Sequence, residues 1–193
     1  MNMPLDAMSD VSDTGLLVRF ANGDRLAAVA LTQRLSPRVL GFATRMLGDA
    51  AEAEDVTQDA MLRLWKIAPE WRQGEAEPAT WLYRVVRNLC IDRLRKARGV
   101  GLDQIAEPED GTPSVEAALI AQDRAAALQL ALNQLPDRQR GAVILRHIEG
   151  LANPEIAQIM EISTEAVESL TARGKRALGA ALSPKREELG YDD

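Results

Sequence analysis

The chain has 193 residues, of which 46% are hydrophobic, and its formal net charge is −6. This length suits one domain or two small ones, and the apolar share is sufficient for a core. A single cysteine, Cys90, excludes an intramolecular disulfide, and a single histidine, His147, leaves little for a metal cluster or a histidine-based catalytic site. We therefore expect a non-enzymatic protein with no metal and no cofactor.

The residue types favour an all-α fold. Ala, Leu, Glu and Arg are abundant, only 4% of the residues are aromatic, and β-branched residues do not alternate over any sustained stretch. No segment approaches roughly 18 uninterrupted apolar residues, and the acidic start MNMPLDAMSDVSD lacks the basic flank and apolar run of a signal peptide. The prediction is a cytoplasmic protein without membrane insertion.

Charge is divided unevenly along the chain. Residues 1–60 hold nine acidic and five basic residues, residues 81–98 hold one acidic and six basic, and residues 99–124 hold six acidic and one basic. Because phosphates require Lys and Arg, a basic stretch framed by acidic ones indicates that different segments meet different partners.

Helical patterns fill the first half. Two helices are predicted on either side of a break at Asn22-Gly23. Ser36-Pro37 has the form of a cap followed by a first-turn proline, and it predicts a new helix that continues to a turn at Gly48-Asp49. The next helix should end near Pro69, and a loop then leads to a long helix at about 78–98.

The likeliest domain boundary is the stretch GVGLDQIAEPEDGTP, which is rich in Gly, Pro and acidic residues. Beyond it we expect a helix to about Leu135, a short helix after Pro136 and a pair of helices. The predicted organisation is a disordered N-terminus at 1–13, a first helical domain at 14–98, an acidic linker at 99–113, a second helical domain at 114–182 and a tail at 183–193.

The segment LANPEIAQIMEISTEAVESLTARGKRAL has the layout of a helix-turn-helix. Asn153-Pro154 predicts a cap with a first-turn proline, Ser163 can cap the second helix, and Glu161 stands in the turn, where glycine would best tolerate a positive φ. In such a motif the second helix lies in the DNA major groove. The candidates for contacts with DNA are Thr164, Glu165, Glu168, Ser169 and Ala172, followed by Arg173, Lys175 and Arg176 for phosphates.

The alternative for this pair is a helical hairpin that only packs within its domain, because amphipathic helix pairs are common. The basic cluster at the end of the second helix favours DNA binding. Glu165 and Glu168 oppose it, since they would face phosphates or bases at a cost, although Glu can accept a hydrogen bond from cytosine N4.

The helix expected at 78–98 has an apolar side and a basic side. Bases stack on aromatic rings while Arg holds the backbone, so cations beside aromatics suit single-stranded nucleic acid. The alternatives are core packing for the tryptophans, Trp65 above all, and a solvated charged face for the arginines. Helical spacing directs Leu82, Val86, Leu89, Cys90 and Leu94 to the core and Arg84, Arg87, Asn88, Asp92, Arg95 and Arg98 to the other side, with Trp65, Trp71, Trp81 and Tyr83 leading into it.

Four motifs occur in a fixed order: AEDVTQDAMLRLWK, TWLYRVVRNLCIDRLRK, LNQLPDRQRGAVILRHIEGL and the helix-turn-helix. In this order and spacing, over about residues 14–182, the chain resembles the bacterial extracytoplasmic-function sigma factors, the short two-domain class of RNA polymerase initiation subunits. The resemblance implies two helical domains, sigma region 2 and sigma region 4, joined by a flexible linker. It also implies that the chain binds core RNA polymerase and promoter DNA and is held by an anti-sigma factor.

The resemblance also assigns sites. In this family the first motif docks on the clamp helices of the polymerase large subunit, here through Asp55, Gln58 and Asp59, and helical spacing adds Leu62 to the same face. The second domain would bind the minus-35 element as duplex. The residues expected to open the minus-10 element and hold its non-template strand are Trp81, Arg84, Arg87, Asn88, Asp92 and Arg95.

The chain departs from the family pattern in the helix-turn-helix. Members often carry a basic residue, Ser and another basic residue where this chain has Glu168, Ser169 and Leu170, and Glu161 replaces the turn glycine. Which residues contact the minus-35 bases therefore stays open.

Two other functions fit parts of the sequence. A stand-alone helix-turn-helix regulator would usually dimerise, and the sequence has no heptad pattern for it. A helical adaptor without DNA function fits the acidic composition but not the basic helix.

Overall fold

The structure is a computed structural model that describes residues 8–72, 76–99 and 117–183. Within these ranges all regular secondary structure is helical, which confirms the predicted all-α fold. The predicted linker lies almost wholly outside the described residues, as do most of the predicted N-terminal segment and tail. The first half contains α2 (Asp13–Ala21), α3 (Arg25–Leu47), α4 (Ala50–Ile67), the short 3₁₀ turn η1 (Ala68–Glu70) and α5 (Pro78–Gly99). The second half contains α6 (Ala117–Asn133), α7 (Asp137–Val143), the π-helical turn η2 (Ile144–Ile148), α8 (Asn153–Met160) and α9 (Thr164–Leu182).

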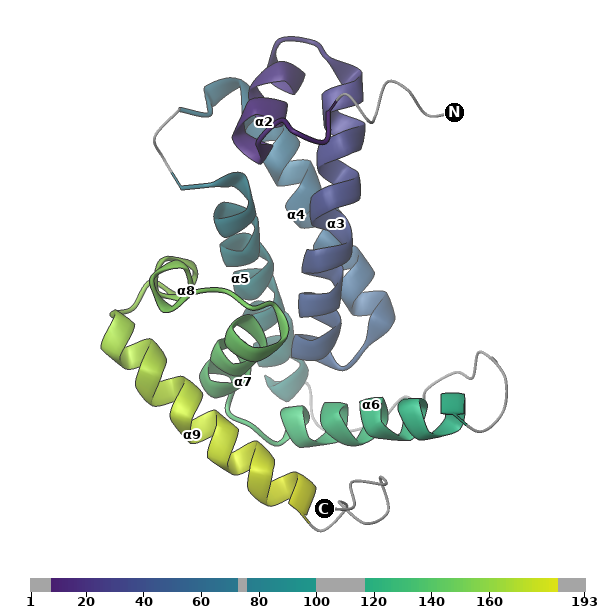
Figure 1. Ribbon diagram of the computed structural model, residues 1–193, viewed down its shortest axis with the longest axis vertical. Coiled ribbons are helices and arrows are strands. Elements are labelled where there is room, and N and C mark those ends of the chain that lie inside the picture. Colours follow the sequence, from purple (N-terminus) through teal and green to yellow (C-terminus); the bar gives the residue numbers. More distant parts are fainter. Residues whose placement is uncertain (1–7, 73–75, 100–116, 184–193) are drawn as a thin grey trace.

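The helix α3 is the centre of the first half. It packs against α2, α4 and α5, and the four helices form a bundle (Figure 1). The core of the bundle uses the residues that the helical patterns point inward, with Val56 and Leu64 of α4 and Leu82 and Cys90 of α5 all buried. The bundle therefore fixes the outward sides of α4 and α5, which carry the predicted polymerase and minus-10 residues.

The helix α3 runs without a break through Pro37, so the prediction of a new helix at Ser36-Pro37 is wrong. A proline inside a helix lacks the N–H for one hydrogen bond and costs about 3 kcal/mol. Leu31, Leu35 and Val39 lie before and after it and are all buried on the core side. Burying large apolar side chains at about 1.5–3 kcal/mol each offsets the proline, so tertiary packing decides the local structure.

The predicted turn at Gly48-Asp49 is confirmed. Gly48 ends α3 with a left-handed φ of 74°, which glycine adopts without steric cost. The Asp49 side chain then caps α4 by accepting a hydrogen bond from the Glu52 N–H at 3.0 Å. This tight turn makes α3 and α4 antiparallel neighbours.

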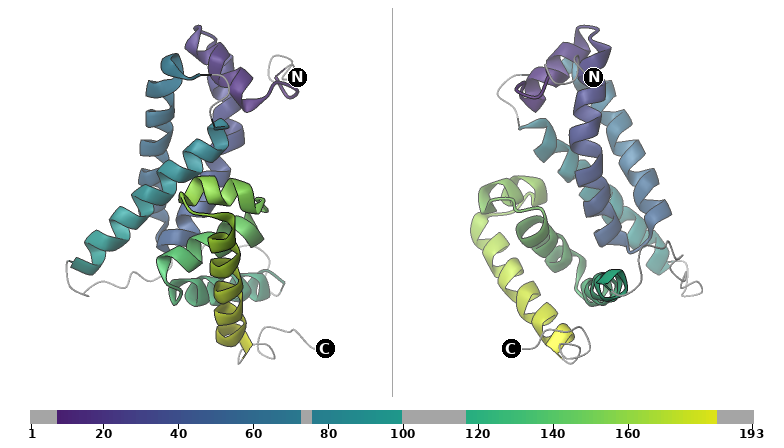
Figure 2. Two further views of the ribbon diagram at one scale, coloured as in Figure 1. Left: turned by 90° about the vertical axis from the view of Figure 1, so that its left-hand side faces the viewer. Right: turned by 45° about the vertical axis from the view of Figure 1, so that its right-hand side comes forward.

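In the second half, α9 is the long helix on which α7, α8 and α6 pack (Figure 2). Gly174 lies where α9 meets α7, and a Cβ there would stand 2.4 Å from Val143 Cγ2. Only glycine permits so close an approach. Ile156 and Ile159 of α8 and Val167 of α9 are buried, as the helix-turn-helix pattern predicts.

The start of α8 differs from the prediction. The cap is Ala152, and Asn153 is the first helical residue, so Asn153 does not cap the helix. The backbone N–H of Ala152 donates instead to Glu155 Oε2 at 2.9 Å. The predicted cap at Ser163 is confirmed, since its Oγ accepts from the Ala166 N–H at 3.2 Å.

Candidate functional site

The acidic face of α4 consists of Asp55, Gln58, Asp59 and Leu62. Asp55 and Gln58 are exposed about one turn apart, and Leu62, a turn further on, keeps 67% of its surface exposed. The Asp59 carboxylate accepts from Arg63, with Oδ2 and Nη2 3.0 Å apart. Such exposed pairs contribute only about 0.3–0.5 kcal/mol. The face therefore combines available acceptors with an uncovered apolar side chain.

An apolar groove of about 470 Å³ lies between α3 and α4 beside this face. A second hollow of about 370 Å³ extends it past Trp65 toward Phe20 and Val29. An acidic face with an apolar groove fits a protein partner better than nucleic acid. The sequence did not predict this groove, because its lining comes from two separate helices; Val29, which lines the second hollow, is an apolar residue at an exposed position of α3. The groove between α3 and α4 is lined by Thr32, Ser36, Leu40, Glu54, Thr57, Gln58, Met61, Leu62 and Trp65.

Trp71 and Trp81 meet at the entrance to α5. Their ring centroids lie 6.1 Å apart in an edge-to-face arrangement, and both rings are half-buried against the core. Half-burial leaves part of each ring accessible to a stacking base. Trp65, for which core packing was favoured, is also half-buried and packs edge-on against Phe20 at 4.8 Å.

The polar side of α5 carries the predicted minus-10 residues. Asn88, Asp92 and Arg95 are exposed, and Arg84 is half-exposed. Arg84 is not free, because its Nη1 lies 3.7 Å from Glu161 Oε1 in the second half of the chain.

Arg87 does not lie on an open polar side as its spacing predicted, because only 8% of its surface is exposed. Its Nη1 donates to Asn88 Oδ1 at 3.1 Å. Burial, together with the nearby Arg138, lowers the pKa of its guanidinium. The physical reason for the difference is tertiary: α8 packs on α5, a contact that helical periodicity alone cannot show.

The turn between α8 and α9 is built on Glu161. Its φ of 56° makes it the one non-glycine residue with a positive φ among those that the structure describes. A left-handed conformation costs a non-glycine residue roughly 1–2 kcal/mol. The turn geometry is thus the one expected for glycine, realised here with a glutamate.

The N-terminal part of α9 presents the predicted minus-35 residues. Glu165 at the helix start has a lowered pKa, because its carboxylate accepts hydrogen bonds from its own backbone N–H and from the Ser163 side chain. Glu168 Oε1 accepts from Asn153 Nδ2 at 3.3 Å, which engages both side chains within the helix pair. The remaining predicted residues lie along the same helix, with Thr164 half-buried and Ser169, Ala172, Arg173, Lys175 and Arg176 exposed.

The described residues contain no group of three or more His, Cys, Asp or Glu side chains placed to hold a metal ion. In the same part of the chain, no helix combines the length and apolarity that crossing a membrane requires.

Two family models match the chain. The model for Sigma-70 region 2 matches residues 31–100, and the model for Sigma-70, region 4 matches residues 125–178. The first match contains α4 and α5, and the second contains α8 and most of α9.

Proteins similar in sequence to this chain are named as RNA polymerase sigma factors. The chain is 30% identical to the RNA polymerase sigma-H factor of Pseudomonas aeruginosa, over 94% of this chain and 99% of that protein. It is 32% identical to the ECF RNA polymerase sigma factor SigM of Mycobacterium tuberculosis, over 89% of this chain and 85% of that protein. Among solved structures, the fold is similar to that of the sigma factor RpoE in complex with the anti-sigma factor NepR from Bartonella quintana, with a TM-score of 0.64, 23% identity, and coverage of 79% of this chain and 94% of that one.

Proposed function

Because the chain belongs to the extracytoplasmic-function family of RNA polymerase sigma factors, we propose that three of its helices have separate roles in transcription initiation. The chain is an alternative sigma factor, which directs promoter recognition for transcription initiation. In the proposal, the acidic face of α4 docks on core polymerase, α5 opens and holds the minus-10 element, and α9 binds the minus-35 element. The stand-alone regulator is disfavoured, because it gives no role to a region 2 domain.

The observation that carries the docking assignment is the acidic face of α4. Asp55, Gln58 and Leu62 stand exposed along one side of the helix, and the α3–α4 groove lies beside them. The proposed partner is the pair of clamp helices of the polymerase large subunit. A helix surface with apolar side chains for the groove and basic side chains for Asp55 and Asp59 would complement this face.

The proposed minus-10 site combines the half-buried ring of Trp81 with Arg84, Asn88, Asp92 and Arg95 of α5, and Arg87 when it is uncovered. Unstacking a base costs a few kcal/mol, which stacking on protein and phosphate contacts can offset. The proposed minus-35 site is the exposed side of α9, where Arg173, Lys175 and Arg176 would bind phosphates and the residues before them would face base edges.

An anti-sigma factor is the proposed regulatory partner. RpoE, whose fold this chain shares, was solved with the anti-sigma factor NepR. The chemistry of this chain's own anti-sigma partner would have to complement an acidic and apolar surface, because the face of α4 is the surface that polymerase must reach.

The direct test of the proposed function is run-off transcription with purified core RNA polymerase on a pool of promoter fragments from the source genome. We expect discrete transcripts that depend on this protein, and their aligned upstream sequences would define both promoter elements. A parallel pull-down with core enzyme separates the possible failures. Absence of both transcripts and core binding would contradict the proposal.

A further inference from the structure

The exposed side of α9 carries acidic and basic residues at different places. Glu165 and Glu168 lie near its N-terminal end, and Arg173, Lys175 and Arg176 follow further along. The helix lies at the edge of the second half (Figures 1 and 2). The N-terminal residues of a recognition helix contact base edges, whereas cations bind phosphates. Carboxylates therefore stand where α9 would contact the bases.

Glu165 serves the start of the helix itself. Its carboxylate accepts hydrogen bonds from its own backbone N–H and from the Ser163 side chain, and these bonds lower its pKa. The Ser163 Oγ in turn accepts from the Ala166 N–H at 3.2 Å. Such bonds satisfy N–H groups that the beginning of a helix leaves unpaired. Glu168 is thus the carboxylate of this surface that remains for DNA.

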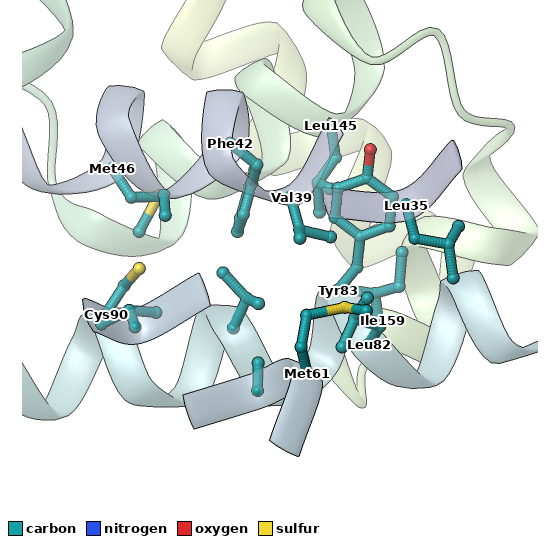
Figure 3. Packing of buried hydrophobic residues seen from close by; sticks show 14 of the residues in the cluster. Leu35, Val39, Phe42, Met46, Met61, Leu82, Tyr83, Cys90, Leu145 and Ile159 are labelled. Atoms are coloured by element: carbon teal, nitrogen blue, oxygen red, sulfur yellow. The ribbon is translucent and has the colours of Figure 1, made fainter. Parts of the chain in front are cut away.

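Glu168 is oriented by a neighbouring amide and keeps its charge. Its Oε1 accepts from Nδ2 of Asn153, the first residue of α8, at 3.3 Å. The helix α8 is itself anchored, because Ile159 is fully buried and lies in the hydrophobic core cluster (Figure 3). The amide is a neutral donor, and none of the ion pairs between described residues includes Glu168. An ionised carboxylate has about four acceptor sites, so Glu168 can accept a further hydrogen bond.

A carboxylate in the major groove distinguishes the bases by their donors. It accepts hydrogen bonds and donates none, so it is repelled by guanine N7 and O6 and by thymine O4, which are all acceptors. Adenine offers an N6–H, but its N7 acceptor lies beside that group on the same edge. Cytosine offers its N4–H without an acceptor of its own beside it. Cytosine is therefore the base that suits a carboxylate best.

We propose that Glu168 selects a cytosine in the minus-35 element by accepting a hydrogen bond from its N4 amino group. The assignment rests on the proposed function, because it assumes that α9 lies in the major groove of that element. Any other base would leave the desolvated carboxylate without a suitable donor, which weakens binding. The cations further along α9 would hold the helix in the groove through phosphates. Promoters of this chain should therefore share a C·G pair opposite Glu168.

The test uses holoenzyme assembled from core RNA polymerase and the full-length chain. A promoter from the run-off experiment is synthesised with its minus-35 element randomised, and the fragments that each holoenzyme retains are sequenced. We expect the wild type to enrich cytosine at one position. Glu168→Gln should change the preference at that position from cytosine to adenine, because a side-chain amide pairs with adenine N6 and N7. Preferences at the other positions should stay the same.

Glu165→Gln is the matched control for this selection. It removes the same charge from the same helix, so it changes the attraction to phosphates for all sequences alike. It should leave the preference for cytosine in place.

The selection also separates the two hypotheses. A wild-type pool without an enriched minus-35 element would contradict the proposed role of α9 and the assignment of Glu168 together. An enriched element that is the same for the wild type and Glu168→Gln would overturn the assignment of Glu168 alone. A change at a position where the wild type prefers a base other than cytosine would overturn it as well.

A substitution in the DNA gives a second measurement. Replacing the selected cytosine by 2-pyrimidinone deletes the N4 amino group, while the base still pairs with guanine. Wild-type holoenzyme should bind this promoter about tenfold more weakly, as measured by competition with the labelled promoter. Glu168→Ala holoenzyme should bind both promoters equally, because it has no acceptor for the amino group. An equal loss of affinity in the wild type and Glu168→Ala would overturn the proposal, since the amino group would then act without Glu168.

Discussion

The guanidinium of Arg140 in α7 donates a hydrogen bond to the carbonyl of Met46 at the end of α3, with Nη1 2.6 Å from the oxygen. Its Nη2 donates to the carbonyl of Asn133 at 2.8 Å, and only 5% of the residue is exposed. Burial lowers the pKa of this guanidinium. A buried cation that closes the carboxyl end of a helix is favoured by the helix dipole and satisfies carbonyls that the helix leaves unpaired.

Arg140→Met should therefore destabilise the protein. The apolar replacement fills much of the space but leaves buried carbonyls without donors, and each unsatisfied group costs about 1–3 kcal/mol. We expect the free energy of unfolding in urea to fall by about 2 kcal/mol or more. The exposed neighbour Arg138 is the control, because Arg138→Met should change stability by less than about 0.5 kcal/mol. Equal effects of both changes would refute the capping role of Arg140.

Glu161→Gly should stabilise the protein when salt screens the ion pair between Glu161 and Arg84. In about 1 M salt, where the Debye length is about 3 Å, the remaining difference is the left-handed backbone at φ 56°. Glycine should then stabilise the protein by about 1 kcal/mol, seen as a higher Tm. Glu165→Gly, in the first turn of α9, should instead destabilise by about 1 kcal/mol. A lower Tm for Glu161→Gly in high salt would show that the turn is not strained.

Helix positions were predictable from the sequence where a local signal decides them. Gly48-Asp49 and Ser163 act through their own backbone and side chains, so the end of α3, the start of α4 and the start of α9 followed from the residues alone. Pro37 and Asn153 gave misleading local signals. At Pro37 packing on both sides outweighs the lost hydrogen bond, and at Asn153 a glutamate three positions beyond Ala152 supplies the cap.

Contacts between the two halves could not be predicted. Arg87 lies at a position that helical periodicity assigns to solvent, yet only 8% of it is exposed, with Arg138 and Glu161 of the second half nearby. The partners Tyr83 and Glu149 are separated by 66 positions, and nothing in either motif signals their hydrogen bond. The α3–α4 groove depends equally on how two helices are spaced.

Cys90 should be unreactive in the folded protein. Burial raises the pKa of its thiol to about 12, and the residue is fully buried. Because the thiolate is the reactive species, Ellman's reagent at pH 8 should modify the native protein only as fast as it unfolds. The same reagent should release one equivalent of chromophore in about 6 M guanidinium chloride. Rapid modification under native conditions would show that α5 is not packed as described.

The double change Asp55→Ala, Gln58→Ala tests the docking face of α4. Both side chains are exposed, so the fold and Tm should be unchanged, while the affinity for core RNA polymerase should fall by about thirtyfold or more, or about 2 kcal/mol. Asp123→Ala, Gln134→Ala removes an exposed acid and amide from the second half and serves as the control. Unchanged co-purification of the α4 variant with core enzyme would refute the docking assignment.

The double change Arg84→Ala, Arg95→Ala separates promoter opening from polymerase binding. Both residues belong to α5 and not to the acidic face of α4; Arg84 is half-exposed and Arg95 is exposed. The variant should bind core polymerase normally, because Asp55, Gln58 and Leu62 are intact, but it should open promoters poorly once the cations for the displaced strand are gone. Permanganate footprinting measures this, since it modifies unpaired thymines. Arg19→Ala, Arg25→Ala is the matched control, because it removes the same charge from exposed residues of α2 and α3. Normal thymine reactivity in the α5 variant would show that these arginines do not hold the melted strand. An equal loss of thymine reactivity in the control would show that the effect comes from the lower net charge and not from Arg84 and Arg95.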